Sequence, residues 1–321
     1  MSRTVIAVTG ASGFIGSRLV DHFLACGQQV RVLIHRNDLD RDVEKFRGSL
    51  FDPRVMDNFL RGVDILFHLA SALGNRILPE SEFFRINRDG TEAVLGAAAK
   101  NCVGKVVHFS SAGVYGRSSG RTPLKESDEL HPVDAYERSK LEGERVALAL
   151  SRSIDVSVIR PGWVYGEGDR RTFKLIRQIQ SGFFFIAGSG EVMHSPIHVG
   201  DLAKLADIVS HRGGRGEIYN GGGDPLAVRI MVDIIASSLK RNIFPVRVPL
   251  ALLEPPAFVL ERLFALWNRE AFLNSSRLAF FKRGKPLDSR KVRVEFGFRP
   301  EVDFRHGIEM AIAWYRNRGW L

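Results

Sequence analysis

Short apolar runs rich in β-branched residues alternate with amphipathic segments along the first half of the chain. Five such runs predict buried strands: Thr4–Val8, Val30–Ile34, Ile65–Leu69, Val106–Ser110 and Val156–Ile159. Helical periodicity between them predicts helices over Gly13–Ala25, Phe83–Ala99 and Asp134–Ser151. Strands that alternate with helices in this way form βαβ units with right-handed crossovers. The pattern therefore predicts an α/β protein with a doubly wound parallel sheet.

The pattern becomes discontinuous after Gly166. Ile218–Asn220 predicts one more short strand, and the residues from about Pro225 onward are mainly helical in pattern. We therefore expect one parallel-sheet domain formed by residues 1–166 and about 196–223. A smaller, mostly helical lobe is expected from residues 167–195 and 224–321.

A glycine-rich turn joins the first predicted strand to the first predicted helix. Gly10, Gly13 and Gly16 are spaced GxxGxxG. Glycines let the backbone approach a pyrophosphate, and the helix start offers free N–H groups to it. A tight turn without a ligand is the alternative, which the strand before and the helix after disfavour. The predicted contacts of a dinucleotide here are Gly10, Ser12, Gly13, Phe14, Ile15 and Gly16.

Tyr136 and Lys140 are four residues apart at the start of a predicted helix, so they share one face. An ammonium beside a phenol favours the phenolate and lowers the tyrosine pKa, which suits proton transfer near neutral pH. A half-exposed tyrosine and a solvated lysine are the alternative. Ser110 and Ser111 end a predicted strand, at the sheet edge where open α/β sheets bind ligands. They would otherwise bond only to loop backbone.

Several segments, in this order and spacing, resemble the extended short-chain dehydrogenases/reductases. This family includes nucleotide-sugar epimerases and dehydratases, 3β-hydroxysteroid dehydrogenases and dihydroflavonol reductases. The resemblance covers nearly all of the chain. The matching segments are Val8–Gly16, Phe67–Ser71, Asn87–Thr91, Ser110–Ser111, Tyr136–Lys140, Arg160–Gly166 and Ile197–Asp201.

The resemblance implies roles for individual residues. Ser111 would be the catalytic hydroxyl, Tyr136 the acid/base, and Lys140 the group that lowers its pKa and binds the nicotinamide ribose. Asn87 would help to order the site. Further implied cofactor contacts are Leu69, Ala70, Ser71, Ser110, Pro161 and Val164. A homodimer formed through Phe83–Ala99 and Asp134–Ser151 is expected from the resemblance alone.

The end of the second predicted strand bears on the choice of coenzyme. NAD sites usually place a carboxylate there, whereas His35 and Arg36 occupy it and the first carboxylate is Asp38. This favours NADP(H), with NAD(H) as the alternative if Arg36 is only a solvated cation. Ser49, followed by Leu50, stands where the family commonly has an aspartate near the adenine. The adenine contacts are therefore expected to be weaker or made by backbone.

Two positions separate substrate classes within the resemblance. Trp163 stands where sugar-nucleotide enzymes carry an asparagine, and His194 lies near the place of their pyrophosphate-binding arginine. Trp163 and the phenylalanines Phe183, Phe184 and Phe185 suit an apolar surface, although packing under a loop also explains the phenylalanines. The prediction is an NAD(P)-dependent oxidoreductase that interconverts a secondary alcohol and a ketone on an apolar substrate, sterol-like or otherwise hydrophobic. The alternative is a nucleotide-sugar epimerase or dehydratase with retained NAD, and a non-catalytic Rossmann binding module ranks last.

Val248–Leu253 and Ala257–Trp267 are unusually apolar, and cations such as Lys282, Arg283 and Lys285 follow them. Peripheral contact with a membrane surface is one interpretation, and a helix packed on the second lobe is favoured over it. The formal net charge of +10 raises affinity for anions. No basic patch interleaved with aromatics points to nucleic acid.

The remaining composition fits an ordinary cytoplasmic enzyme. Cys26 and Cys102 suggest no disulfide framework and fit a reducing compartment. No CxxC motif or histidine cluster predicts a metal. The first residues lead directly into a strand without a signal-peptide pattern. No run approaches the roughly 18 to 20 apolar residues that would span a bilayer.

Overall fold

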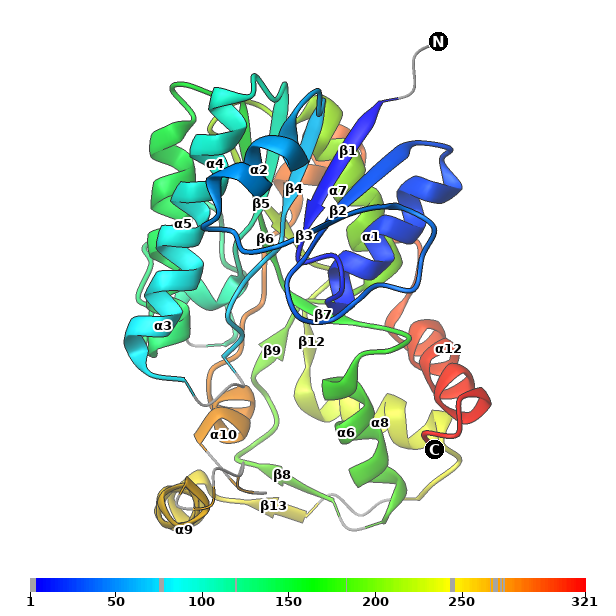
Figure 1. Cartoon of the computed structure of the whole chain (residues 1–321). Coiled ribbons are helices and arrows are strands. Elements are labelled where there is room, and N and C mark those ends of the chain that lie inside the picture. Colours follow the sequence, from blue (N-terminus) through cyan, green and yellow to red (C-terminus); the bar gives the residue numbers. More distant parts are fainter. Residues whose placement is uncertain are drawn as a thin grey trace.

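The computed structural model describes residues 4–74, 78–118, 120–182, 184–242, 246–265, 267, 271, 273 and 275–321. A seven-stranded sheet, parallel throughout, forms its centre (Figure 1). In sheet order the strands are β11 (Ile218–Gly221), β6 (Val156–Pro161), β5 (Lys105–Phe109), β4 (Ile65–His68), β1 (Val5–Thr9), β2 (Gln29–Ile34) and β3 (Glu44–Arg47). The α/β fold and the predicted strands are confirmed. The edge strand β3 was not predicted, because its sequence, Glu-Lys-Phe-Arg, is polar.

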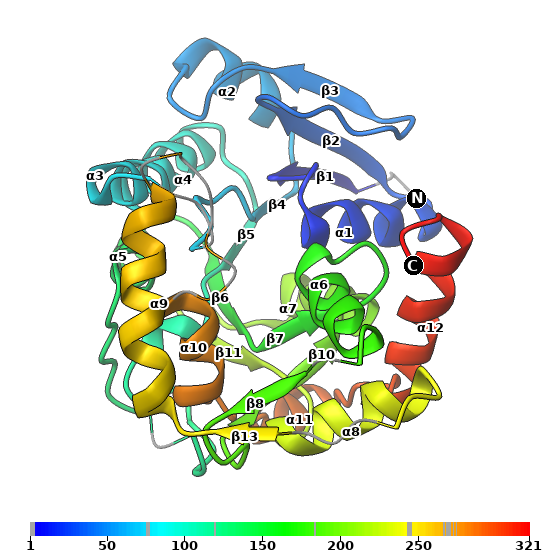
Figure 2. The same ribbon diagram turned by 90° about the horizontal axis from the view of Figure 1, so that it is seen from below.

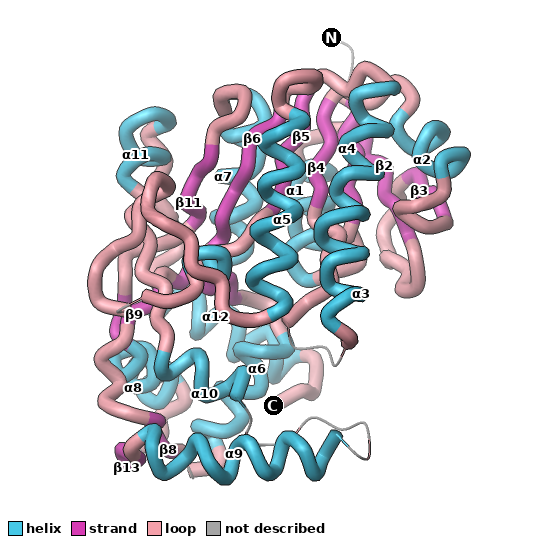
Figure 3. Tube along the Cα trace, turned by 90° about the vertical axis from the view of Figure 1, so that its left-hand side faces the viewer, coloured by secondary structure: helices cyan, strands magenta, loops and turns pink. Residues whose placement is uncertain are grey.

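Helices cover both faces of this sheet, as a parallel sheet requires. On one face lie α1 (Phe14–Ala25) and α7 (Val199–Arg212). On the other lie α2 (Pro53–Leu60), α4 (Gly90–Lys100) and α5 (Ala135–Leu150). Figure 3 shows α4 and α5 in front of the strands, with α1 and α7 behind them. Each face has its own apolar core, so the strands are buried on both sides.

Most of the remaining elements extend from the end of the sheet at which its strands terminate (Figures 1 and 2). They are η2 (Ala112–Tyr115), β7 (Trp163–Tyr165), α6 (Arg170–Gln180), β8 (Phe185–Ala187), β9 (Met193–His194), β10 (Pro196–His198), β12 (Leu226–Ala227), α8 (Val228–Ser238), β13 (Val246–Val248), α9 (Leu250–Ala265), α10 (Ser275–Lys282) and α12 (Phe304–Asn317). The helix α11 (Arg290–Phe296) lies instead beside β11 at the side of the sheet (Figure 3). A third apolar core joins α6, α8 and α12. Val292 and Phe298 belong instead to the core beneath α1 and α7. The predicted division into two domains stays a prediction. Val292 and Phe298, which lie within the predicted second lobe, pack with the sheet.

The helix α9 lies at the outer end of this lobe, away from the sheet (Figure 1). Ala257 is buried against Ala187 and Leu278, as the packing interpretation requires. The large side chains of Leu252 and Phe258 are exposed on the same helix. No helix among the described residues is both long and apolar enough to cross a bilayer. Contact of α9 with a membrane surface stays a prediction, which co-sedimentation with anionic lipid vesicles would test.

Candidate active site

The turn between β1 and α1 is held tightly against the loop that follows β4. Gly10 has φ +72°, and a Cβ added there would lie 2.7 Å from the backbone nitrogen of Ala70. A Cβ on Gly16 would lie 2.3 Å from the carbonyl oxygen of Gly10. Only glycine fits at either position. The predicted residues Leu69 and Ala70 are therefore brought directly against the glycine-rich turn.

The first turn of α1 is uncapped. Gly13 occupies its N-cap, no side chain accepts a hydrogen bond there, and the first turn contains no acidic residue. By contrast, Asp52, Asp134 and Asp169 cap α2, α5 and α6. The N–H groups of the first turn after Gly13 and the helix dipole there suit the phosphates of a dinucleotide. The residues present thus fit the cofactor that the glycine spacing predicts.

Ser111, Tyr136 and Lys140 come together at the carboxyl end of β5. Asp134 caps α5 by accepting from the Glu137 backbone N–H, which starts the helix just before Tyr136. The Lys140 ammonium donates to the carbonyl oxygen of Phe109 at 2.6 Å. The hydroxyl of Ser111, two residues further on, hydrogen-bonds to Tyr136. The predicted triad is therefore one cluster, and its catalytic roles remain to be tested.

The pKa of Tyr136 does not follow the expectation from sequence. Burial raises it above its ordinary value, and the largest opposing influence is the hydrogen bond to Ser111, not the Lys140 ammonium. Burial lowers the pKa of Lys140 to about 8, with Glu144 acting in the opposite direction. The ammonium is directed at the Phe109 carbonyl. The spacing of four residues therefore predicted that Tyr136 and Lys140 share a helix face, but it did not predict that the pKa of Tyr136 is raised.

Two buried histidines lie beneath this cluster. The rings of His68 and His108 are 5.4 Å apart. Burial, together with the charge of Lys140, lowers the pKa of His68 to about 3 and shifts that of His108 in the same direction. Both imidazoles are therefore neutral at physiological pH. The buried hydroxyl of Ser110 finds no hydrogen-bond partner in the part of the chain that is described.

Asn87 organises the floor of the site. It lies in a π-helical turn, η1 (Arg85–Asp89), between α3 (Glu80–Phe84) and α4. Its buried amide accepts from the Ala72 N–H at 2.7 Å and from the Ser71 hydroxyl at 2.9 Å, and donates to the Ser139 hydroxyl at 2.9 Å. These bonds tie the loop after β4 to α5. Such π turns are frequent at functional sites, and the arrangement suits the ordering role that the resemblance implied.

His35 and Arg36 follow β2 and are exposed, as expected for residues that could contact the ribose end of a dinucleotide. Asp38 is engaged elsewhere: Arg47 donates to it at 2.5 Å and Lys45 lies 3.4 Å away. The hydrogen bond from Arg47 is the main cause of a lowered pKa at Asp38. This carboxylate is therefore already committed to two cations.

Ser49 and Leu50, which replace the family's usual pattern near the adenine, lie between β3 and α2. The Ser49 hydroxyl accepts from the Phe51 N–H at 3.2 Å. Leu50 approaches Gly90 at the start of α4, where an added Cβ would come within 3.2 Å of it. The Ser49 hydroxyl is therefore used in a hydrogen bond within its own turn. This agrees with the expectation of weaker side-chain contacts to an adenine.

The predicted substrate residues separate into two groups. Trp163, in β7, lies among aromatic rings, with ring centroids 5.4 Å from Phe280 and 5.8 Å from Phe304. Phe184 is only 6% exposed and belongs to the core of the lobe, so packing accounts for it. Phe183 lies outside the described residues. Pro161, the last residue of β6, and Val164, in the middle of β7, are both buried.

His194 is a structural histidine in this fold. It is buried, stacked on the Phe280 ring at 4.3 Å, and its Nε2 lies 2.9 Å from the Phe280 carbonyl oxygen. Burial lowers its pKa to about 4, so it is neutral. The imidazole supports the wall next to Trp163 and offers no charge to a substrate diphosphate. The sequence predicted a substrate contact at His194, whereas the side chain is turned into the lobe.

A charged cluster beside the triad was not predicted. Glu137 follows Tyr136 and packs against Gly113, while Arg283 and Lys285 approach its carboxylate at 3.8 and 4.0 Å. Burial raises the pKa of Glu137 and lowers that of Lys285 to about 8. The position of Glu137 was visible in the sequence, next to the tyrosine. The two cations were not, because they come from a segment nearly 150 residues later.

Comparisons with known proteins identify the family. Residues 6–222 match the NAD dependent epimerase/dehydratase family, which covers more than half of the chain. The chain belongs to this family of NAD-dependent oxidoreductases, dehydratases and epimerases. The resemblance to extended short-chain dehydrogenases/reductases is thereby confirmed.

Individual relatives span almost the whole chain. It is 28% identical to a 4-hydroxy-2-methyl-3-oxo-4-farnesyl-3,4-dihydroquinoline-1-oxide ketoreductase of Stigmatella aurantiaca, over 94% of each chain. It is 30% identical to sterol demethylase protein B of Methylococcus capsulatus, over 98% of this chain and 99% of that one. The structure of the dTDP-glucose 4,6-dehydratase DesIV from Streptomyces venezuelae, with NAD and TYD bound, superposes with a TM-score of 0.78. That pair is 27% identical over 99% of this chain and 98% of the other.

We expect the activity of this site to fall as pH rises through about 8. The resemblance implies that Lys140 holds a coenzyme ribose with its charge, and burial lowers the pKa of Lys140 to about 8. Tyr136 stays protonated there because its pKa is raised. The measurement is kcat/KM from pH 6 to 10. Lys285 has a similar pKa, so the fall must persist in Lys285→Met if Lys140 causes it, and its disappearance in that variant would overturn the assignment.

Proposed function

We propose that this protein is an NAD(P)H-dependent oxidoreductase that interconverts a secondary alcohol and a ketone on an apolar substrate. The observation that carries the proposal is the convergence of Ser111, Tyr136 and Lys140 at the carboxyl end of β5. A proton donor, an orienting hydroxyl and a cation suit reduction of a carbonyl. The aromatic rings around Trp163 suit a substrate without a diphosphate.

Each residue of the triad has a distinct task in this proposal. The nicotinamide of the coenzyme supplies or accepts the hydride. The Tyr136 hydroxyl donates its proton to the carbonyl oxygen during reduction and takes it back during oxidation. Ser111 donates a hydrogen bond that positions the same oxygen. Lys140 holds the ribose with its ammonium, and Asn87 keeps α5 and the loop after β4 in register with one another.

Two observations support an apolar substrate. Trp163 replaces the polar anchor of sugar-nucleotide enzymes and is surrounded by Tyr165, Phe280 and Phe304. His194 is buried and neutral where a cation would hold a diphosphate. The names of two relatives agree with this, since one is a ketoreductase of a farnesyl-bearing quinoline oxide and the other a sterol demethylase protein.

Replacing Trp163 by Asn tests the substrate surface. The loss of a large aromatic contact of about 1.5–3 kcal/mol should lower kcat/KM for an apolar ketone by about 10- to 100-fold. Trp163→Phe keeps a ring and should lose less. NADPH affinity and thermal unfolding serve as controls for the fold. Unchanged kcat/KM in Trp163→Asn would remove this residue from the substrate surface.

NADP(H) is proposed as the preferred coenzyme. Arg36 is exposed directly after β2, and the nearest carboxylate, Asp38, is committed to Arg47 and Lys45. A cation at this place suits a ribose 2′-phosphate. A charge-assisted hydrogen bond is worth about 1.5–3 kcal/mol. Arg36→Ala should therefore weaken NADPH binding by about 10- to 100-fold and leave NADH binding unchanged in fluorescence titrations, whereas equal effects on both would contradict the proposal.

The alternative is a nucleotide-sugar epimerase or dehydratase, as the likeness to DesIV indicates. One observation favours it: a cleft of about 500 Å³ beside β9 is lined by Arg121, Met193 and Arg229. Arginines suit a diphosphate. Arg229, however, is ion-paired with Glu191 at 2.8 Å. A protein that retains NAD⁺ and binds a nucleoside diphosphate in this cleft would support the alternative.

A further inference from the structure

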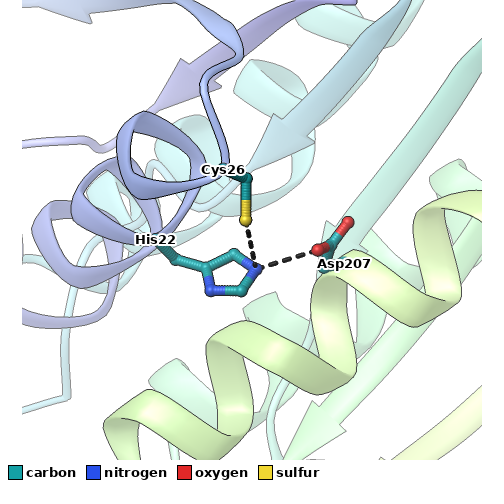
Figure 4. Close-up of side chains that lie close together, drawn as sticks. All are labelled: His22, Cys26 and Asp207. Carbon is teal, nitrogen blue, oxygen red and sulfur yellow. Dashed lines mark hydrogen bonds and ion pairs between the residues drawn. The ribbon is translucent and has the colours of Figure 1, made fainter.

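Three metal-ligating side chains, those of His22, Cys26 and Asp207, meet where α1 ends beside α7. His22 and Cys26 are four residues apart at the end of α1, and Asp207 and His211 are four residues apart on α7. Residues with this spacing lie on one side of a helix. Figure 4 shows His22, Cys26 and Asp207 turned toward one another, with the imidazole edge between the thiol and the carboxylate. This cluster belongs to neither the triad nor the glycine-rich turn.

The ligand atoms are close together. The His22 Nε2 lies 2.8 Å from Asp207 Oδ2 and 3.9 Å from Cys26 Sγ, and all three potential ligand atoms lie within 4.8 Å of one another. His211 Nε2 lies 3.3 Å from Asp207 Oδ1. Bonds of about 2.0–2.3 Å to a tetrahedral zinc ion place its ligand atoms about 3.3–3.8 Å apart. Small side-chain rotations would therefore bring the atoms from their present spacing to that of a zinc site.

We propose that His22, Cys26 and Asp207 bind a zinc ion. A thiolate, an imidazole and a carboxylate are ligands that Zn²⁺ prefers, whereas Mg²⁺ and Ca²⁺ prefer oxygen ligands alone. The side chains of His22 and Asp207 are 22% and 28% exposed, so an ion can reach them from solvent. Binding would release the thiol proton of Cys26.

Such a site would clamp two helices that cover the same face of the sheet. α1 carries the uncapped turn at Gly13 at its other end, and α7 starts at the strand β10, which pairs with β7. A metal bound only by the folded chain stabilises that fold by mass action. The ion would lie at the end of α1 opposite the glycine-rich turn, so its role is structural and it takes no part in proton or hydride transfer.

A simple ion pair between His22 and Asp207 is the competing explanation. That pair already joins α1 to α7 and requires neither Cys26 nor His211. The thiol therefore distinguishes the two explanations. Cys102 is a matched control because it is also free and exposed and lies on another part of the chain, after α4.

The test is a Co²⁺ titration of the reduced, metal-free protein, followed by displacement with Zn²⁺. We expect one equivalent of Co²⁺ to produce a thiolate-to-cobalt absorption band, which Zn²⁺ removes. Cys26→Ser should abolish the band and weaken Zn²⁺ binding by at least about 10- to 100-fold, the range that even an outer-shell partner contributes. Asp207→Asn should weaken it similarly, and Cys102→Ser should behave as wild type.

Thermal unfolding with and without Zn²⁺ gives a second, independent readout. The midpoint should rise with Zn²⁺ in the wild type and in Cys102→Ser, and should not rise in Cys26→Ser. A band or a Zn²⁺-dependent shift that survives in Cys26→Ser would overturn the proposal. So would the absence of stoichiometric, saturable binding to the wild type, which would leave only the ion pair.

Discussion

Tyr136→Phe is expected to retain coenzyme binding and to lose turnover. The phenol is held in the site by Ser111, and burial keeps its pKa high, so the hydroxyl is protonated and ready to donate. Loss of a general acid in the transition state costs about 10²- to 10⁴-fold in rate. Phenylalanine keeps the ring that faces Phe83, with ring centroids 6.5 Å apart in the wild type. The fold should therefore be unchanged.

The measurement is single-turnover reduction of an apolar ketone, together with NADPH titration by fluorescence. The control is Ser111→Ala, which removes the orienting hydroxyl but leaves the proton donor, and which should lose less activity than Tyr136→Phe. If Tyr136→Phe turned over within a fewfold of the wild type, Tyr136 could not be the acid. A parallel loss of NADPH binding would instead indicate damage to the site.

Arg160→Met is expected to lower the free energy of unfolding by about 3–5 kcal/mol, which is the usual consequence of leaving one buried charge without its partner. Arg160 and Glu144 are each 2% exposed, and two hydrogen bonds of 3.0 and 2.5 Å join them. The guanidinium also donates to the Tyr115 hydroxyl at 3.0 Å and to the Glu126 carbonyl at 3.1 Å. A domain of ordinary stability has only about 5–15 kcal/mol in total.

Urea denaturation of the wild type, of Arg160→Met and of a double variant tests this expectation. The double variant Arg160→Met/Glu144→Leu removes both charges and should recover most of the stability, because an apolar pair of similar volume is often neutral. Burial lowers the pKa of Lys140, and Glu144, one turn further along α5, opposes that shift. The double variant, which removes Glu144, should therefore also move the pH profile of activity to lower pH. Equal stability of Arg160→Met and the wild type would contradict this expectation. It would show that water or neighbouring groups stabilise the Glu144 carboxylate when Arg160 is absent.

The sequence predicted the features that depend on near neighbours. The GxxGxxG turn follows from strand, glycines and helix in direct succession, and the structure shows why Gly10 and Gly16 cannot be replaced. The shared face of Tyr136 and Lys140 follows from a spacing of four. The central strands follow from apolar runs, whereas the polar edge strand β3 does not.

Features that depend on tertiary packing could not be predicted in this way. His194 and Phe184 are marked by position in the sequence, but only the folded lobe shows that both are turned into its core. The pKa of Tyr136 is set by burial, which no local pattern contains. The His22 and Asp207 pair joins segments 185 residues apart. The homodimer still rests on the resemblance alone. It was expected to form through the segments that contain α4 and α5, whereas the exposed apolar side chains of Leu252 and Phe258 lie on α9.

The most direct test of the proposed reductase is to identify the nucleotide that the purified protein carries and to titrate it with NADPH and NADH. Mass spectrometry of the released nucleotide gives the first answer and coenzyme fluorescence the second. An empty protein that binds NADPH exchangeably, and more tightly than NADH, is the predicted result. Tightly retained NAD⁺ that does not exchange would contradict the account, because a coenzyme regenerated in place belongs to an epimerase or dehydratase.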